Sequence, residues 1–423
     1  MAKIISQVTF ADYGEIEILG DLERFLLALS GMDDEELMVC LESMRGRGRN
    51  DYPVRVMWNL IIAMKVFGHR TVESFRRELS RNSQLRKICG LDDFANKKHI
   101  VPPARVFTKF LKLLSSVQLD IDKIFSNSVN NLGEQLPDFG KTQAGDGKYL
   151  DSYAKGSSKN PNPKAGDRAD NDAQWSVKEY HYTDKAGNPK VKKEYHYGFK
   201  AHIICDVKTE LPIAYNVLAA NSDERKAMLE MLMEMPGWLR DRAEYLLLDR
   251  GYDSTEMIQT IKKCGIVPIV DICNHWKDGE TTRQYKDTNI VYDYCGNVYM
   301  ADDKGDLHKM YYEGYDIQKK CLRYSYNGKV YKIYVSYDER IFLPVARSSK
   351  KFERLYKGRT SVERLNGRLD RDYMYEDHCI RGLKKMRLML SLTLLTMNAM
   401  ALGKIQQGTT EHLAALTKLP DAA

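Results

Sequence analysis

The chain has 423 residues, 43% of them hydrophobic and 29% charged, with a formal net charge of +7. This length favours two or three domains over one, and the hydrophobic content is enough for a sizeable core. A mildly basic chain is compatible with a polyanionic partner, and the basic excess is concentrated in residues 341–388, which hold thirteen Lys or Arg and six Asp or Glu.

The same sequence argues against three other classes of protein. None of the eight cysteines belongs to a CxxC pair, so we do not expect a structural zinc site. The first residues contain no signal-peptide pattern, which favours a reduced, cytoplasmic compartment. The longest apolar stretch, residues 388–402, is short for a membrane span and contains polar residues, so we expect a buried helix and no membrane partner.

Residues 1–125 are expected to form a helical N-terminal DNA-binding domain. Apolar residues recur at helical spacing over residues 57–64 and in three later segments, the second of which is expected to stop at Gly90. In the last segment Arg105 and Lys109 lie on a basic stripe beside the apolar one. Such a stripe suits contact with DNA phosphates, although a solvated polar face explains any one helix almost as well.

Residues 140–272 alternate between strand and helix patterns and are expected to form the first part of an α/β catalytic core. Strands are predicted at 145–150, 195–207, 210–219, 244–249 and 265–272, with helices from about 222 and over 254–264. Residues 152–193 are rich in Gly, Pro, Asn and Lys, so we expect a long loop there, with room for a short hairpin.

Residues 273–345 interrupt this pattern with tyrosine-rich, strand-like segments, and we expect an inserted, mostly β subdomain there. Residues 346–405 return to helical patterns and are expected to complete the catalytic core with C-terminal helices. The expected fold class is therefore α/β: a mixed sheet flanked by helices, interrupted by a β insertion and preceded by a helical domain.

Three carboxylates stand where they are able to converge. Asp146 lies in a short predicted strand between two glycines, Asp249 directly follows a buried strand, and Glu363 lies on a late helix among arginines. Carboxylates held together bind Mg²⁺, and two such ions promote phosphodiester chemistry. Taken singly, Asp146 fits a turn residue, Asp249 a helix cap and Glu363 half of a surface ion pair. Their order along the chain, strand, strand end and helix, favours the catalytic interpretation.

The order of these elements and motifs resembles the DDE transposases of bacterial insertion sequences. In that family the first Asp lies in a context similar to AGDGKYLDSYA here, and the second opens a D-x-G-Y segment, here Asp249 to Tyr252. Tyr356, Arg359 and Glu363 fit the family's Y-x2-R-x3-E signature, and a β-rich insertion before it is typical of one branch. The resemblance covers nearly the whole chain and implies a ribonuclease-H-like fold.

The resemblance also implies a function: a transposase that binds the terminal inverted repeats of its element and catalyses metal-dependent strand cleavage and strand transfer. It implies that Asp146, Asp249 and Glu363 hold Mg²⁺, for which Mn²⁺ can substitute. The implied partners are double-stranded DNA, at the element ends and the target, and a second copy of the chain in the DNA complex. The expected DNA contacts are Tyr356 and Arg359 beside the cut, with Lys148, Lys200, Arg364 and Arg368 as further phosphate contacts.

Some positions depart from the family pattern or leave a choice open. The signature usually continues to a Lys seven residues after the Glu, but this position is Asp370 here, with Arg368 and Arg371 beside it. Asp151 is a rival for the first ligand, although its separation from Asp146 places the two on opposite faces of a regular strand. The alternative functions are a non-transposing nuclease of the same fold, or a DNA-binding regulator derived from a transposase and indifferent to Mg²⁺.

Overall fold

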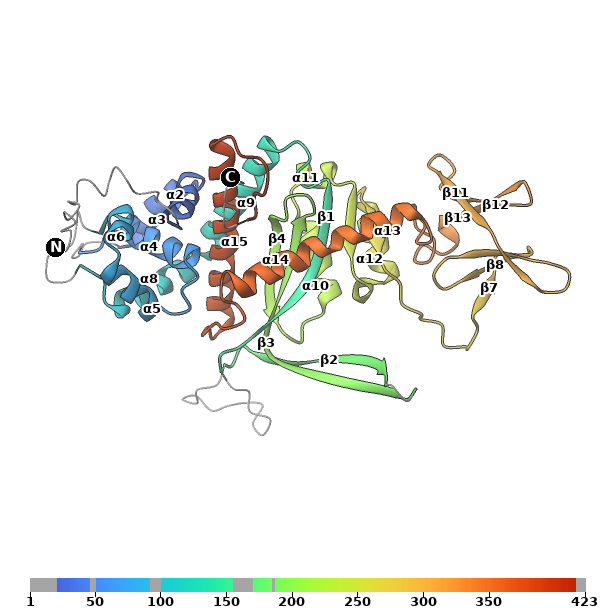
Figure 1. Cartoon of the computed structure of the whole chain (residues 1–423), viewed down its shortest axis with the longest axis horizontal. Helices are drawn as coiled ribbons and strands as arrows, with labels where there is room; N and C mark the ends of the chain where they lie inside the picture. Colours follow the sequence, from blue (N-terminus) through green and yellow to red (C-terminus); the bar gives the residue numbers. More distant parts are fainter. Residues whose placement is uncertain (1–20, 46–50, 92–99, 155–169, 185–186, 416–423) are drawn as a thin grey trace, which may run out of the picture.

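A computed structural model describes residues 21–45, 51–91, 100–154, 170–184 and 187–415 of the chain. The N-terminal part is helical and lies at one end of the molecule (Figure 1). Its helices are α2 Asp21–Ser30, α3 Glu35–Arg45, α4 Val54–Val66, α5 Val72–Arg81, α6 Ser83–Cys89, α8 Ala104–Ser116 and α9 Gln118–Gln135. The helical character predicted for this part of the chain is confirmed.

Local sequence signals set the ends of these helices. Thr71 caps α5 by accepting a hydrogen bond from the Ser74 N–H at 3.0 Å, and the Ser74 hydroxyl oxygen accepts one from the Thr71 N–H. Gly90 ends α6 in the left-handed conformation, with a φ of 81°, at the predicted stop. Along α8 the apolar stripe is buried whereas Arg105 and Lys109 are exposed, so the basic stripe faces solvent.

The part of the chain that follows α9 is built on a mixed sheet. Its strands are β1 Thr142–Asp151, β2 Gln174–Thr183, β3 Pro189–Asp206, β4 Pro212–Ala219, β5 Tyr245–Leu248 and β6 Val267–Val270. Between β4 and β6 the chain forms α10 Glu224–Glu234, α11 Gly237–Arg242, the short helix η1 Arg250–Tyr252 and α12 Thr255–Lys263. Five strands run in the order β4-β3-β1-β5-β6, with β3 antiparallel to its neighbours and the other pairs parallel. This arrangement confirms the predicted ribonuclease-H-like α/β class.

The strand β2 and the first half of β3 form a two-stranded arm that projects from the sheet (Figure 1). Their antiparallel pairing runs from Gln174 opposite Gly198 to Thr183 opposite Pro189. Within residues 152–193, where a long loop with room for a short hairpin was expected, the structure has a hairpin from residue 174 onward that is longer than expected, while residues 155–169 lie outside the described residues. These strands lack an alternating apolar pattern because side chains on both faces of the arm are exposed.

The insertion that follows β6 consists of two small sheets with a hydrophobic core of their own. One sheet holds β7 Thr282–Gln284, β8 Ile290–Asp293, β9 Val298–Ala301 and β10 Leu307–Lys309. The other holds β11 Tyr311–Asp316, β12 Cys321–Tyr326 and β13 Lys329–Tyr334, followed by the short helix η2 Val335–Tyr337. Several of its tyrosines, among them Tyr292 and Tyr324, are buried in this core. The mostly β character predicted for the insertion is confirmed.

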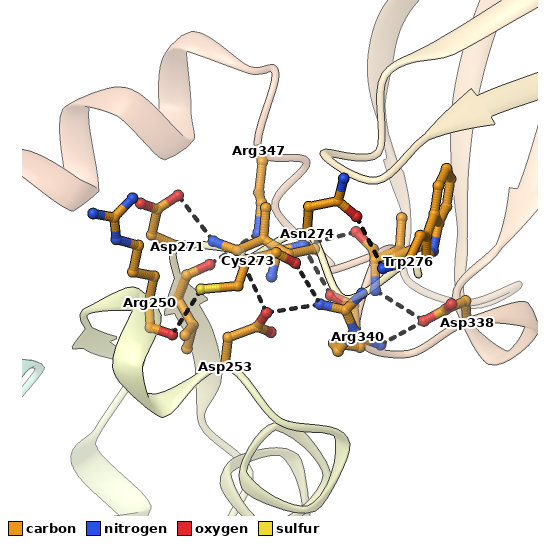
Figure 2. A network of polar contacts seen from close by, with 12 residues as sticks. Arg250, Asp253, Asp271, Cys273, Asn274, Trp276, Asp338, Arg340 and Arg347 are labelled. Carbon is orange, nitrogen blue, oxygen red and sulfur yellow. Dashed lines mark hydrogen bonds and ion pairs between the residues drawn. The ribbon is translucent and has the colours of Figure 1, made fainter. Parts of the chain in front are cut away.

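The two ends of the insertion meet at a buried polar junction (Figure 2). Arg340 donates hydrogen bonds to Asp253 at 2.7 Å and to the carbonyl of Cys273 at 3.1 Å. Arg347 donates to the Val270 carbonyl at 2.9 Å and to two carbonyls of the exit segment. The side chain of Asp253 is fully buried, so its ion pair with Arg340 ties the exit of the insertion firmly to the catalytic core.

The chain then returns to the core through α13 Lys350–Tyr356, the short helix η3 Lys357–Arg359, α14 Thr360–Arg371 and α15 Leu383–Gln406. By length and composition α15 is apolar enough to cross a membrane, but 89% of its apolar window is buried within the fold. It packs against α2, α9 and β4, between the N-terminal helices and the sheet (Figure 1). The buried helix expected at residues 388–402 is confirmed, and one continuous core joins the helical part to the sheet.

Candidate active site

Two parallel strands bring the two aspartates to the same edge of the sheet. The strands β1 and β5 pair in parallel, with Ala144 opposite Leu247. Asp146 and Asp249 each lie two residues beyond this pair, and neighbouring strands are about 4.8 Å apart. The register therefore sets the two carboxylates side by side at the edge where open α/β sheets bind ligands. Asp249 is held there because it caps η1, accepting the Gly251 N–H at 2.8 Å.

The carboxyl group of Asp146 is in an environment that disfavours its negative charge. Burial and the charge of Asp249 raise the pKa of Asp146 to about 6. The Gly147 N–H, which donates to Asp146 at 2.9 Å, and the nearby charge of Arg359 oppose this shift. A carboxylate destabilised by a like charge beside it is a group that a bound cation stabilises.

A glycine allows the signature segment to lie directly on the sheet. A Cβ at Gly358 would lie 2.9 Å from a methyl group of Val207 and 3.0 Å from one of Leu247. Any larger residue would therefore force either η3 or the side chains of Val207 and Leu247 to move. Because Gly358 has no side chain, η3 lies close enough to carry Tyr356 and Arg359 to the two aspartates.

Arg359 links the three predicted metal ligands. Its guanidinium forms an ion pair with Glu363, one helical turn further along the chain. Burial alone would lower the pKa of Arg359, but the charges of Glu363, Asp146 and Asp249 raise it. Tyr356 lies beside this group: burial raises its pKa, the charges of Asp271 and Asp249 raise it further, and Arg359 lowers it. The structure thus brings these five residues to one site.

The donor set at this site suits a hard divalent cation. Among the described residues, the oxygens of the three carboxylates do not all come within 4.8 Å of one another, and Glu363 is paired with Arg359. Beside the aspartates, the buried hydroxyl of Tyr252 has no hydrogen-bond partner among the described groups. Burial and nearby carboxylates, including Asp146 and Asp249, raise the pKa of Tyr252 well above its usual range. An orphaned hydroxyl beside repelling carboxylates fits a hydrated Mg²⁺ ion.

Three of the basic residues expected to bind phosphates lie along the same side of the sheet. Lys148 pairs with Asp370 at 2.6 Å, so β1 supplies a cation near the position where the family signature has its Lys. Arg364 and Arg368 both pair with Glu210 in the turn between β3 and β4. The side chain of Arg364 is 54% exposed and that of Arg368 only 12%. Arg364 is therefore open to a ligand, whereas Arg368 anchors the turn.

Lys200 does not lie where DNA could reach it, which corrects the expectation that it binds a phosphate. It is 2% exposed, its ammonium group pairs with Glu224, and it lies 3.9 Å from the centroid of the Tyr149 ring. In the register of β1 and β3, Lys200 is opposite Tyr149, an odd number of residues (three) from Asp146, which is opposite Ile203. Since successive side chains alternate across a sheet, Lys200 faces α10 and serves as the buried counterion of Glu224.

One carboxylate at this edge was not identified from the sequence. The strand β6 pairs with β5 in parallel, with Val270 opposite Leu248, so Asp271 is in register with Asp249. After burial, the charge of Asp271 is the largest influence that raises the pKa of Tyr356. The signal was present, because VPIVD repeats the pattern of an apolar strand that ends in Asp.

A second cluster of metal-binding residue types lies at the junction with the insertion. Asp253, Cys273 and His275 form the one group, within the part of the chain that the structure describes, whose ligand atoms all lie within 4.8 Å of one another. Asp253 already pairs with Arg340 and accepts the Cys273 N–H at 2.9 Å. Because a guanidinium compensates the charge of Asp253, we assign this cluster to the structural junction.

Asp146 within β1, Asp249 at the end of β5, and Glu363 with Arg359 on the helical segment beside them form a site suited to phosphoryl transfer. A family model described as transposase DDE domain matches residues 163–399, more than half of the chain. The chain therefore belongs to the transposase DDE domain family, and its function is that of a transposase. The match includes Asp249 and Glu363 and begins after Asp146. Residues 19–113 match a second family model, transposase domain (DUF772).

A solved structure with some similarity to the chain is that of piggyBac transposase in a synaptic complex with hairpin DNA. The two sequences are 10% identical, and the similarity covers 93% of this chain and 77% of that chain with a TM-score of 0.39. No curated protein sequence matches the chain.

Proposed function

We propose that the chain binds the terminal inverted repeats of an insertion sequence and catalyses DNA strand cleavage and strand transfer. The observation that carries this proposal is the register of β1 and β5, which sets Asp146 beside Asp249 and within reach of the charge of Arg359. Two repelling carboxylates beside a guanidinium suit a site that must hold cations and a phosphodiester together. Two copies of the chain would bring two element ends together, in the cytoplasm.

Asp146, Asp249 and Glu363 would hold Mg²⁺, for which Mn²⁺ can substitute. Their carboxylates are the hard oxygen ligands that these ions prefer. When bound, the metal supplies positive charge that stabilises the phosphoryl oxygens in the transition state. Glu363 would become available as a ligand once Arg359 releases it, and a bound cation would offset the burial and the charge of Asp249 that raise the pKa of Asp146.

Arg359 is proposed to exchange Glu363 for a phosphate of the element end. A guanidinium binds phosphate with two parallel hydrogen bonds, so DNA competes well for it. The ring of Tyr356 stacks on Phe352, with centroids 5.6 Å apart, and this packing fixes its position beside Arg359. Further along the duplex, phosphate contacts from Lys148, Arg364, Arg105 and Lys109 would add affinity that carries no sequence information.

In the cleavage step a water oxygen attacks the phosphorus atom at the element boundary. The bond from phosphorus to the 3′ oxygen of the element strand breaks, which leaves a 3′-hydroxyl on the element and a 5′-phosphate on the flank. In the transfer step this 3′-hydroxyl attacks a phosphodiester of the target, and the target's own 3′ oxygen leaves. Each step exchanges one phosphorus–oxygen bond for another, so the residues of the chain need only hold and align the phosphate and stabilise its charge.

The direct test is cleavage of a labelled duplex that carries the element end, with Mg²⁺ or Mn²⁺. The variants are Asp249→Asn and Glu363→Gln. A matched control is Glu353→Gln, because Glu353 is an exposed glutamate that pairs with Lys357 one turn away, as Glu363 pairs with Arg359. We expect the wild type and the control to cut at the element boundary. The two ligand variants should bind the duplex but cut it at least about 10³-fold more slowly than the wild type does.

The remaining outcomes separate the alternatives. If every protein binds the duplex equally and none cuts with either metal, the catalytic proposal fails and a DNA-binding regulator describes the chain. If the wild type cuts but never joins the element 3′ end to a target, the chain is a nuclease of this fold.

A further inference from the structure

The β2–β3 arm is a surface that the proposed active site does not use. Its two strands pair with each other beyond the body of the sheet, and β2 is the edge strand (Figure 1). Many of the exposed large hydrophobic side chains of the described residues lie on the arm: Trp175, Val177, Tyr180, Tyr182, Val191 and Tyr195. A concentration of exposed apolar side chains on a projecting element marks an interaction surface.

One face of the arm combines lysines with tyrosines. In the strand register Tyr180 is opposite Lys192 and Tyr182 is opposite Lys190, and Lys178 lies two residues before Tyr180. Since residues opposite each other share a face, these five side chains lie together, and we call this the lysine face. The ammonium groups of Lys178 and Lys192 lie 5.1 Å and 5.9 Å from the centroid of the Tyr180 ring. Exposed lysines along one face are suited to the phosphates of a nucleic-acid backbone.

The opposite face of the arm is different in character. Val177 is opposite Tyr195 there, and Trp175 and Val191 lie on the same side. The charged pair on this side, Glu179 and Lys193, is closed at 2.7 Å. We call this the apolar face, and it suits a protein partner better than DNA.

The acidic residues on and beside the lysine face do not block it. Glu194 pairs with Lys192 at 2.7 Å, and Asp184 pairs with Lys190 at 3.0 Å. The two lysine side chains are 64% and 55% exposed, and exposed pairs of this kind contribute about 0–1 kcal/mol. A DNA phosphate is therefore able to replace either carboxylate.

The base of the arm is fixed to the strand that carries Asp146. Tyr149, three residues along β1, stacks on His196 with ring centroids 4.0 Å apart and hydrogen-bonds to Ser176 at 2.9 Å. Lys190, Lys192, His196 and Lys200 share one face of β3, so the lysine face continues the side of the sheet that carries Lys200, and its base lies against β1 three residues from Asp146. From this base, ten paired residues extend about 33 Å, which is close to one turn of DNA.

We propose that the lysine face of the arm binds the DNA duplex beside the cleavage site, with the two-stranded ribbon lying along the major groove. A two-stranded ribbon fits a groove about 12 Å wide. Lys178, Lys190 and Lys192 bind backbone phosphates, and Tyr180 and Tyr182 pack against the groove wall. The position of the DNA in this inference rests on the proposed function, whereas the binding of duplex DNA by the arm does not.

The test compares the full-length wild type with two variants of the arm. The first replaces the three lysines of the lysine face (Lys178→Ala, Lys190→Ala and Lys192→Ala), and the second changes the apolar face (Val177→Ser and Tyr195→Ser). All five side chains are exposed or at the surface of the arm, so both variants should fold. Affinity is measured for an element-end duplex and for a random duplex of equal length over a series of salt concentrations, without divalent metal. Mass photometry records the assembly state.

We expect the lysine-face variant to lower the slope of log affinity against log salt by about 3 on both duplexes, since each phosphate contact contributes about 0.9. The apolar-face variant should bind as the wild type does. An unchanged affinity and slope for the lysine-face variant would overturn the inference. So would a change confined to the apolar-face variant together with a change in assembly, because the partner of the arm would then be protein.

The same experiment separates this inference from the proposed function. If the wild type binds random duplex through the lysine face but does not cut the element end in the cleavage assay, the proposed function fails and the inference stands. If the wild type binds neither duplex, both fail.

Discussion

Replacing Asp146 with Asn is expected to stabilise the metal-free protein while it removes activity. In the folded chain, burial and Asp249 raise the pKa of Asp146 from 3.8 to about 6. The folded state therefore binds this proton more tightly than the unfolded chain does. The stability associated with the protonated form is fully present below about pH 4 and is lost as the pH rises through about 6. Asn carries no charge, and its side-chain oxygen can still accept the Gly147 N–H.

The size of the effect follows from the shift. A difference of about 2 pKa units at about 1.4 kcal/mol each corresponds to roughly 3 kcal/mol at pH 7.5, as an upper limit for a half-buried group. At pH 4.5 the same arithmetic leaves only about 1 kcal/mol. The Asn variant should thus be more stable than the wild type by up to about 3 kcal/mol at pH 7.5, and the advantage should shrink in acid.

Equilibrium urea unfolding in EDTA at the two pH values measures this difference. The control is Asp151→Asn, because the Asp151 side chain is 61% exposed and pairs with His196, so its loss should change stability by less than about 0.5 kcal/mol. Saturating Mg²⁺ should stabilise the wild type and not Asp146→Asn. An Asp146→Asn variant that is no more stable than the wild type at pH 7.5 would refute the reasoning. A larger, pH-dependent gain for Asp151→Asn would instead identify Asp151 as the desolvated ligand.

Three further predictions follow from the contacts at the site and the junction. Arg359→Gln should raise the affinity for Mn²⁺ without DNA by about tenfold, because Glu363 loses its internal cation, and it should weaken binding of the element end. Calorimetry measures the first effect and a gel shift the second. An unchanged Mn²⁺ affinity would contradict the exchange of Glu363 for phosphate. Arg340→Met should lower the free energy of unfolding, measured in urea, by about 3–5 kcal/mol, since it leaves the buried Asp253 uncompensated. The double variant with Asp253→Asn should recover part of this loss. No recovery would show that the pair itself is not responsible. Gly358→Ala should slow cleavage about 100-fold with DNA binding retained. The control is Gly367→Ala, where a Cβ meets no atom within 4 Å, and this variant should cleave DNA at the wild-type rate. Equal cleavage rates for the two variants would show that the close approach of η3 is not required.

The position of Asp249 could be predicted because its signal is local. A buried apolar run followed by a charge places that charge at a strand end, whatever the rest of the chain does. The orientation of Lys200 could not be predicted in this way, since it depends on the register between β1 and β3. The i,i+4 pairing of Arg359 with Glu363 was among the readings that the sequence allowed, but the sequence did not show that the same guanidinium also lies near Asp146 and Asp249.

The arm and Asp271 show two different limits of sequence reasoning. Both faces of β2 meet solvent, so no period of two distinguishes its residues from a polar loop, and only its pairing with β3 reveals a strand. Asp271 repeated the pattern that identified Asp249, but the significance of the second strand end appears only when β5 and β6 are seen to be neighbours.

The place of α15 in the fold has a consequence for how the protein is made. This helix comes late in the chain but lies against α2, and a Cβ at Gly403 would come within 2.3 Å of the Leu27 carbonyl oxygen. At about 5–20 residues per second, a ribosome takes tens of seconds to reach α15 after it has finished α2. During that time the N-terminal helices lack the surface that buries them. A chain broken off before residue 383 therefore yields neither a completed helical layer nor a closed core, so partial copies should not persist as stable competitors for the element ends.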